Sequence, residues 1–273
     1  MTVPRPATMP TGIASLDPVL DGGVPSGSVI LLLGEIGAGA PEFAYSSVIS
    51  LSLKKARADP PGTPAGLYYI TLTRTGRSVL EEMELSFHQD LLAGVESQVT
   101  FMDLSNLYFE STVVPSEWYG NGDLIERLQR RSREDEPLAE LAGKLSGIPA
   151  GSAIIIDSLT ELATQSLNEH RWAELVAFLR GLGRVVKQWN SMVYLILTDG
   201  ILEEHRVVEI ADCCDAVMNF RWEETSAQRR QRIMFVQKFR GVMPHLEERD
   251  LVKFAVRISA EGGFEVANVR VVV

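Results

Sequence analysis

The sequence predicts an α/β fold: a mainly parallel central sheet flanked by helices, with an antiparallel, β-rich C-terminal end. Short apolar runs alternate with amphipathic stretches from Val29 onward, and such alternation is typical of a parallel sheet covered by helices. After Ala216 the pattern changes to apolar runs joined by turns, and the Glu-Gly-Gly stretch at residues 261–263 is a hairpin signal. Because neither a repeat nor a long linker interrupts the sequence, we expect one domain over residues 11–273 and a flexible tail over residues 1–10.

The apolar runs supply the expected strands. Val29 to Leu33 is apolar throughout, as in a strand buried on both faces, and a second continuous run ends in Asp157. We expect the parallel strands at residues 28–33, 67–72, 99–104, 152–156 and 193–198, and the antiparallel strands at residues 216–222, 231–240, 251–258 and 264–273.

The helices are predicted from apolar residues at helical spacing and from turn signals. Pro41 suits the first turn of a helix. A short amphipathic segment carrying Ile13, Leu16 and Leu20 stops at Gly22, a helix-ending residue. Longer helices are predicted at residues 41–55, 77–87, 169–189 and 203–210, with polar helical segments near residues 123–133 and 137–145.

Composition and charge narrow the class of protein. The chain has 273 residues, of which 45% are hydrophobic, which is enough to form a large core within one domain. No apolar run reaches the ~18 residues of a membrane span, and the N-terminus lacks an apolar signal core. We therefore expect a cytoplasmic protein. The net charge of −10 argues against a broad nucleic-acid surface.

Metal and nucleophile chemistry have little support in the sequence. Cys213 and Cys214 are adjacent and have no His at metal-ligand spacing. Ser158 and Thr160 have no His partner that would activate them as nucleophiles. We expect no metal site built from cysteine and histidine, and no catalytic residues can be assigned.

The stretch after the first strand has the spacing of a phosphate-binding P-loop but lacks its chemistry. That motif needs Gly, four residues, Gly, then Lys and Ser or Thr. Gly34 and Gly39 have the spacing, whereas Ala40 replaces the Lys and Pro41 the hydroxyl residue. Proline also lacks a backbone N–H. Since each charge-assisted hydrogen bond is worth roughly 1.5–3 kcal/mol, nucleotide binding should be weakened by several powers of ten.

Two glutamates near this loop bear on the same question. Glu35 lies in the loop and Glu42 in the first turn of the helix. A helix N-terminus attracts anions, so Glu42 could occupy the phosphate position with the protein's own carboxylate. The alternative is an ordinary first-turn residue that points to solvent.

Several motifs in order resemble the KaiC-like branch of the RecA superfamily of P-loop ATPases. These motifs are the Thr11-Gly12 to Asp17 segment, Gly22-Gly23, the loop with Gly34, Gly37 and Gly39, the Ile154 to Thr160 segment, Ala211-Asp212 to Val217, and Lys238-Phe239-Arg240-Gly241. The resemblance runs from Thr11 to the C-terminus and is weakest between Ser105 and Gly151. It implies a RecA-like P-loop NTPase fold.

The resemblance also implies a function and an assembly. Such proteins are ATPases of timing, signal transduction or DNA-linked processes, and most form hexameric rings with ATP between subunits. Lys238 and Arg240 match the segment that reaches the neighbouring subunit's phosphates. Thr73 and Arg74 stand where the family has a pair of catalytic glutamates, and neither is a plausible general base.

Asp157 is the one acidic site residue that is retained. It matches the carboxylate that orients Mg²⁺ at the end of an apolar strand. The alternative is a structural Asp that caps the following turn through its side chain.

Two hypotheses follow. The first is a degenerate KaiC-like protein, inactive as an ATPase and without a cofactor, which acts in regulation or signal transduction by binding a protein partner or itself. The second is a nucleotide-dependent ATPase or sensor that binds ATP with Mg²⁺ at an altered site of Gly34, Gly37, Gly39 and Asp157, completed by Lys238 or Arg240 of a neighbouring subunit.

Overall fold

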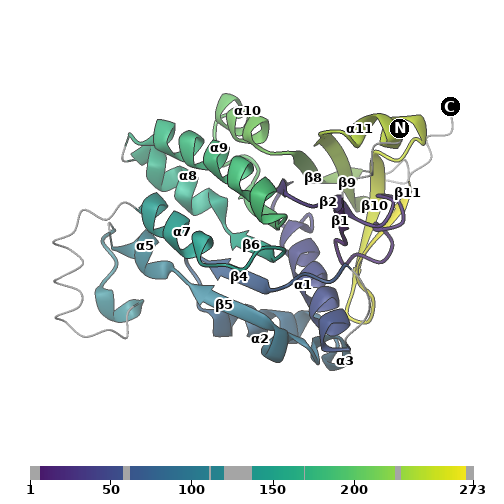
Figure 1. Ribbon diagram of the computed structural model, residues 1–273, viewed down its shortest axis with the longest axis horizontal. Helices are drawn as coiled ribbons and strands as arrows, with labels where there is room; N and C mark the ends of the chain where they lie inside the picture. Colours follow the sequence, from purple (N-terminus) through teal and green to yellow (C-terminus); the bar gives the residue numbers. More distant parts are fainter. Residues whose placement is uncertain are drawn as a thin grey trace.

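The fold is a nine-stranded sheet with helices on both faces, seen in the computed structural model of Figure 1. The structure describes residues 7–57, 62–110, 112–119, 137–168, 170–224 and 229–268. The strand order is β11-β10-β9-β8-β3-β7-β6-β4-β5. The strands are β3 (Ser28–Gly34), β4 (Leu67–Thr71), β5 (Val99–Asp103), β6 (Ala153–Asp157), β7 (Met192–Thr198), β8 (Ala216–Glu224), β9 (Arg230–Phe239), β10 (Lys253–Ser259) and β11 (Gly263–Asn268).

The pairing of the strands changes once along the sheet, from parallel to antiparallel, as the sequence predicts. All pairs from β5 to β8 are parallel, and β8, β9, β10 and β11 pair antiparallel. Because β3 lies between β7 and β8 and is buried at all seven positions, its continuous apolar run is explained. The predicted α/β class is confirmed.

The sheet divides the core into two layers, and helices cover each of its two faces. The longer ones are α1 (Ala40–Ala56), α2 (Gly76–Ser86), α7 (Pro137–Ser146), α8 (Leu159–Asn168), α9 (Trp172–Trp189) and α10 (Glu204–Cys213), and the shorter ones are α3 (Gln89–Leu92), α4 (Val95–Gln98), α5 (Ser105–Phe109) and α11 (Met243–Glu248). Side chains alternate along β3: Ile30 and Leu32 pack in the layer with α1, whereas Leu31 packs in the layer with α8 and α9.

Two helix predictions need correction, and a third is not tested. The helix expected over residues 169–189 begins at Trp172, and the separate helix α8 precedes it. His170, between them, has a positive φ of 57°, which breaks the helical path. Residues 13–20 form consecutive hydrogen-bonded turns instead of a helix. The segment expected near residues 123–133 lies outside the described residues.

The tail predicted over residues 1–10 is too long at its C-terminal end. Thr8–Met9 form β1, which pairs antiparallel with β2 (Val24–Pro25). Met9 is buried in the core. A strand pairing with a segment 15 residues away leaves no local signal, which is why the sequence did not predict it. Residues 1–6 lie outside the described part of the chain.

The motif Thr11-Gly12 to Asp17 is structural. The Asp17 carboxylate accepts hydrogen bonds from the Thr11 backbone N–H and hydroxyl, each at 2.7 Å, and from the Gly12 N–H at 3.2 Å. Ser47 of α1 donates to the Thr11 carbonyl. The segment is thereby fixed against α1.

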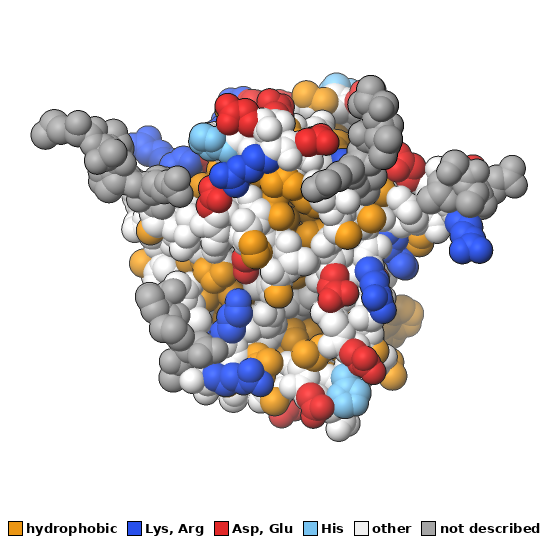
Figure 2. Space-filling model, turned by 90° about the vertical axis from the view of Figure 1, so that its right-hand side faces the viewer, with side chains coloured by type: hydrophobic (Ala, Val, Ile, Leu, Met, Phe, Trp, Pro, Cys, Tyr) orange, Lys and Arg blue, Asp and Glu red, His pale blue; other side chains and the backbone are white. Residues whose placement is uncertain are grey.

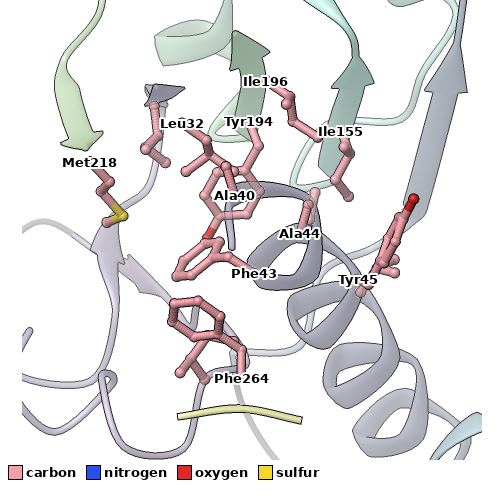
Figure 3. Packing of buried hydrophobic residues seen from close by; sticks show 14 of the residues in the cluster. Leu32, Ala40, Phe43, Ala44, Tyr45, Ile155, Tyr194, Ile196, Met218 and Phe264 are labelled. Carbon is pink, nitrogen blue, oxygen red and sulfur yellow. The ribbon is translucent and has the colours of Figure 1, made fainter. Parts of the chain in front are cut away.

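An aromatic cluster joins the C-terminal strands to α1 (Figure 3). The Phe43 ring makes edge contacts with Tyr194 at 5.6 Å, Phe220 at 5.6 Å and Phe264 at 5.2 Å between centroids. Such pairs add about 0.5–1.5 kcal/mol each beyond area burial. The β10–β11 hairpin is therefore an integral part of the core.

One side of the molecule carries charges of both signs. Figure 2 views the side of β10, β11 and α11, where acidic and basic side chains are interspersed with apolar ones. No helix within the described ranges is long and apolar enough to cross a membrane.

Candidate functional site

The candidate site lies at the carboxyl ends of neighbouring parallel strands. Gly34 ends β3, Thr71 ends β4 and Asp157 ends β6, and Thr71 and Asp157 are paired in register. Ligands of open parallel sheets bind at this edge. The structure therefore places the predicted glycines and Asp157 at the same edge of the sheet, with β7 between their strands.

Gly34, Gly37 and Gly39 each have a geometric reason to be glycine. Gly37 and Gly39 have φ values of 73° and 116°, which other residues rarely adopt. A Cβ atom on Gly34 would lie 2.7 Å from the Cβ of Ala40. The loop thus turns tightly from β3 into α1 and needs these residues whether or not it binds phosphate.

Side chains and backbone groups of β8 and β9 hold the loop from outside. The Glu35 carboxylate accepts from the Trp222 backbone N–H at 3.0 Å, and the Trp222 indole donates to the Ile36 carbonyl at 3.1 Å. Arg232 Nε donates to the Gly37 carbonyl at 2.9 Å. Arg230 and Arg232 also lie over the Trp222 ring, at 4.3 and 4.6 Å from its centroid.

The start of α1 is apolar where a P-loop would be charged. Ala40 is 3% exposed and packs with Phe43 and Ala44 in the core (Figure 3). A Cβ atom on Gly39 would lie 3.2 Å from Ile258 and 3.3 Å from Phe264, so the C-terminal hairpin packs directly on the loop.

Glu42 lies in the first turn of α1, and its Oε2 atom is buried without a hydrogen-bond partner. This geometry disagrees with the alternative in which Glu42 simply points to solvent. A carboxylate near a helix N-terminus interacts favourably with the helix dipole. It would also repel an incoming triphosphate.

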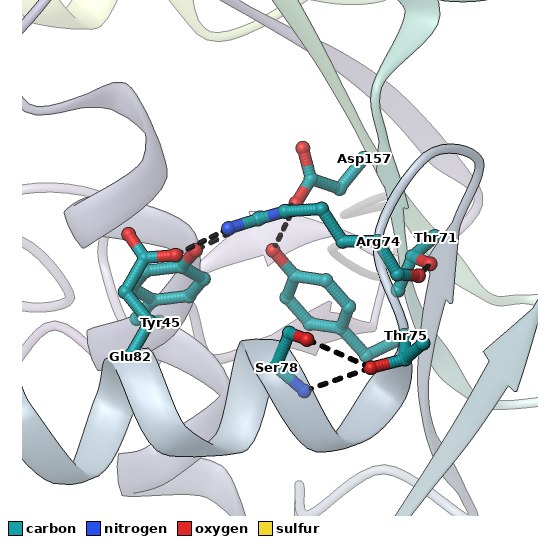
Figure 4. A network of polar contacts seen from close by, with 8 residues as sticks. Tyr45, Thr71, Arg74, Thr75, Ser78, Glu82 and Asp157 are labelled. Carbon is teal, nitrogen blue, oxygen red and sulfur yellow. Dashed lines mark hydrogen bonds and ion pairs between the residues drawn. The ribbon is translucent and has the colours of Figure 1, made fainter. Parts of the chain in front are cut away.

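Arg74 is the centre of a polar network at this edge (Figure 4). Its guanidinium pairs with the carboxylates of Asp157 and Glu82 and donates to the Tyr45 hydroxyl at 2.9 Å. The Tyr69 hydroxyl donates to Asp157 Oδ2 at 2.8 Å. The network connects α1, β4, α2 and β6 through one cation.

Asp157 is well shielded in this network, since only 13% of its side chain is exposed. The turn that follows is capped by Ser158, whose Oγ accepts from the Thr160 N–H at 3.2 Å. The structural alternative for Asp157 was therefore wrong in detail: Asp157 forms an ion pair with Arg74, and its neighbour makes the cap. The Asp157–Ser158 peptide bond is cis.

The pKa values of Arg74 and of the two tyrosines in the network are all raised. Burial raises the pKa of Tyr45 and Tyr69, and the nearby Asp157 charge raises both further. Burial alone would lower the pKa of Arg74, but Asp157 and the tyrosines raise it above its usual value. Arg74 is thus a permanent cation, the neutral Tyr69 donates to Asp157, and the neutral Tyr45 accepts from Arg74.

These residues do not fit magnesium and a triphosphate. The position of the Mg²⁺-orienting carboxylate is already paired with an arginine, and a cation placed there would meet the Arg74 charge. Neither Ala40 nor Pro41 supplies a ligand or a phosphate contact. In the part of the chain that the structure describes, no three His, Cys, Asp or Glu side chains gather at metal-binding positions.

Lys238 and Arg240 lie near the start of β8, at the amino ends of the parallel strands and away from the loop. Their side chains form hydrogen bonds within their own chain. Lys238 Nζ donates to the carbonyls of Ala211 and Asp212 at 2.8 and 3.1 Å, and Arg240 donates to the Asp212 carbonyl at 2.7 Å. Both thereby satisfy carbonyls at the end of α10. Their predicted contact with a neighbouring subunit stays a prediction.

Comparison with known proteins agrees with this architecture. The family model of the KaiC ATPase matches residues 9–262. The chain belongs to the KaiC family of ATPase domains. It therefore has the RecA-like P-loop fold, as predicted.

A solved structure matches this KaiC-family chain over nearly its whole length. A KaiC-like protein from the hyperthermophilic archaeon Pyrococcus horikoshii OT3 aligns with 96% of this chain and 100% of its own, at 16% identity and a TM-score of 0.60. At that identity the match supports the fold alone. None of the curated proteins compared with the chain gives a match.

From the sequence, Arg74 was noted only as the residue that stands in place of a catalytic glutamate. The parts that Tyr45, Tyr69, Glu82 and Trp222 play at the site were not predicted. A signal was present for Tyr69, because a tyrosine on an otherwise apolar buried strand needs a partner for its hydroxyl. Tyr45 and Glu82 lie on different helices, so their meeting with Arg74 depends on tertiary packing.

Proposed function

We propose that this KaiC-family protein does not hydrolyse ATP and acts in regulation or signal transduction, by associating with itself or with a protein partner. The ion pair between Arg74 and Asp157 supports this proposal best. It neutralises the carboxylate that the family uses for Mg²⁺ with a side chain from the position of a catalytic glutamate.

The loop chemistry supports the same conclusion. Ala40 and Pro41 supply neither the charge nor the hydroxyl of a P-loop, and Glu42 adds a negative charge nearby. At roughly 1.5–3 kcal/mol for each charge-assisted hydrogen bond, these losses remove most of the affinity of such a site for nucleotide. The glycines are explained by the turn geometry.

Association is supported by the family resemblance and by one local feature. Ile36, at the tip of the loop, is 82% exposed, and a solvated loop that cradles phosphate has no need of an exposed apolar residue. The competing proposal, a site completed by a neighbour, requires Lys238 and Arg240 to leave the carbonyls that they now satisfy.

Thermal unfolding and ATP turnover test the proposal. Millimolar Mg-ATP should not change the melting temperature, whereas a ligand at a hundred times its dissociation constant adds about 2.7 kcal/mol. Turnover should be at background in the wild type and in Asp157→Asn alike. A stabilising shift, or turnover that Asp157→Asn abolishes, would favour the nucleotide-dependent alternative. Analytical ultracentrifugation measures self-association in the same samples.

A further inference from the structure

A basic pocket lies at the amino ends of the parallel strands, at the edge of the sheet opposite the P-loop. It has a volume of about 410 Å³ and lies between α9, the end of α10 and the start of β8. Its charged lining residues are Arg180, Arg184, Lys187, Asp212, Asp215 and Arg240. The seven residues of β3 separate it from the loop, about 20 Å along a strand.

We propose that this pocket binds a small oxyanion of the phosphate class, of the size of pyrophosphate. The lining carries four cations and two acids, a local positive excess in a chain whose net charge is −10. Such an excess in a concave site raises the local concentration of anions.

Asp215 does not neutralise the whole pocket, because its carboxylate is already engaged. Its side chain is 8% exposed, Oδ1 lies 2.8 Å from Lys187 Nζ and 3.7 Å from Arg240, and Oδ2 accepts from the Val29 N–H at 3.1 Å. Arg240 also donates to the Asp212 carbonyl. Lys187 and Arg240 therefore have structural roles that account for their presence.

Arg180 and Arg184 make no such contact with a carbonyl or a carboxylate in the described residues, although Arg180 is a hydrogen-bond partner of the Cys213 thiol. They are exposed and stand four residues apart on α9, so they lie on the same face of the helix. Within the described part of the chain neither makes an ion pair. Arg180 also faces the Cys213 thiol, whose pKa is raised by burial, so at neutral pH the thiol adds no negative charge.

The geometry favours phosphate over a single carboxylate. Guanidinium groups donate in a planar fork that fits two oxygens of an oxyanion. Side chains four residues apart on a helix are separated by about 5–6 Å at their Cβ atoms. A diphosphate offers enough oxygens for both forks at that spacing, whereas acetate can satisfy only one.

Calorimetric titration of the full chain with sodium pyrophosphate, at low salt and with EDTA to exclude divalent metals, tests the proposal. The pocket variant is Arg180→Gln/Arg184→Gln. The matched control is Lys144→Gln/Arg257→Gln, which removes the same charge from exposed positions elsewhere. Circular dichroism and melting curves verify that both variants fold. Orthophosphate and acetate are titrated in parallel arms.

Wild type and control should bind pyrophosphate equally, and the pocket variant about tenfold or more weakly, since each lost charge-assisted bond is worth at least that factor. Orthophosphate should bind more weakly and acetate not measurably. Full binding by the pocket variant would place the anion elsewhere, the P-loop included, and overturn the proposal. So would equal losses in both variants, acetate binding as tight as pyrophosphate, or no binding by the wild type at about 10 mM. The result is independent of the Mg-ATP experiment, because no Mg²⁺ is present.

Discussion

Arg74 is bonded to Asp157 across the carboxyl ends of β4 and β6, at the edge where proteins of this fold bind their ligands. The partner of the strand-end carboxylate is thus an arginine side chain. Arg74 also reaches Glu82 and Tyr45, so it joins α1, α2 and β6 at this edge of the sheet. The network is a structural element of the fold, and its loss should reduce stability.

Arg74→Gln should lower the free energy of unfolding by about 1–3 kcal/mol. Breaking a fully buried ion pair costs about 3–5 kcal/mol, and the smaller figure allows for the 33% exposure of the Arg74 side chain. Urea unfolding measures the change. The matched control is Arg77→Gln, which removes an exposed pair with Glu81 and should leave stability unchanged. Equal effects in both variants would contradict the role assigned to Arg74.

Restoring the P-loop residues alone should not restore nucleotide binding. In Ala40→Lys/Pro41→Thr the Lys and the hydroxyl are back, but Asp157 is still paired with Arg74 and Glu42 is still in the first turn. Calorimetry with Mg-ATP should give no binding at millimolar ligand, provided that circular dichroism shows a folded variant. Saturable binding by this double variant would show that Arg74 does not block the metal position.

Gly12→Ala should destabilise the fold by about 1–3 kcal/mol. Gly12 has a φ of 82°, and an added Cβ would lie 2.7 Å from the Ser47 carbonyl oxygen. Gly181→Ala is the control: this glycine lies inside α9 with nothing within 4 Å of an added Cβ, and alanine there should add about 0.5–1 kcal/mol. Thermal melts of the two variants should shift in opposite directions.

The buried Cys214 thiol predicts a specific loss of stability in alkali. Burial raises its pKa from the usual value of 9.0 to about 12. Between these values the unfolded chain carries a thiolate and the folded chain a thiol, so the folded state loses up to about 1.4 kcal/mol per pH unit. Below pH 9 the contribution is fully present.

Urea unfolding of the wild type and of Cys214→Ala at pH 8, 9 and 10 tests this linkage. The stability of the wild type should fall by about 1 kcal/mol more than that of the variant between pH 9 and 10. Groups remote from Cys214 titrate alike in both proteins and cancel. Parallel pH profiles would show that the thiol is not protected by the fold.

The sequence alone determined the class of fold and the place of the loop. The apolar runs of β3 and β6 are buried on both faces, so their hydrophobicity had to be continuous, and that local pattern is readable without a structure. The glycine spacing and the missing Lys and hydroxyl were equally local. The paired strands β1 and β2, the break between α8 and α9 and the limits of the turns near residue 13 were not predicted from local patterns.

The tertiary structure determined which side chains Asp157 and Arg74 contact. The sequence left open whether Asp157 orients Mg²⁺ or caps the following turn. It showed Arg74 only as a residue at the position of a catalytic glutamate. Their pairing depends on β4 lying beside β6 in register, with α1 and α2 bringing Tyr45 and Glu82 to the same point. Residues 74 and 157 are far apart along the chain, and no local preference encodes such a contact. Only the packing of the sheet brings this carboxylate and this arginine into one partly buried ion pair.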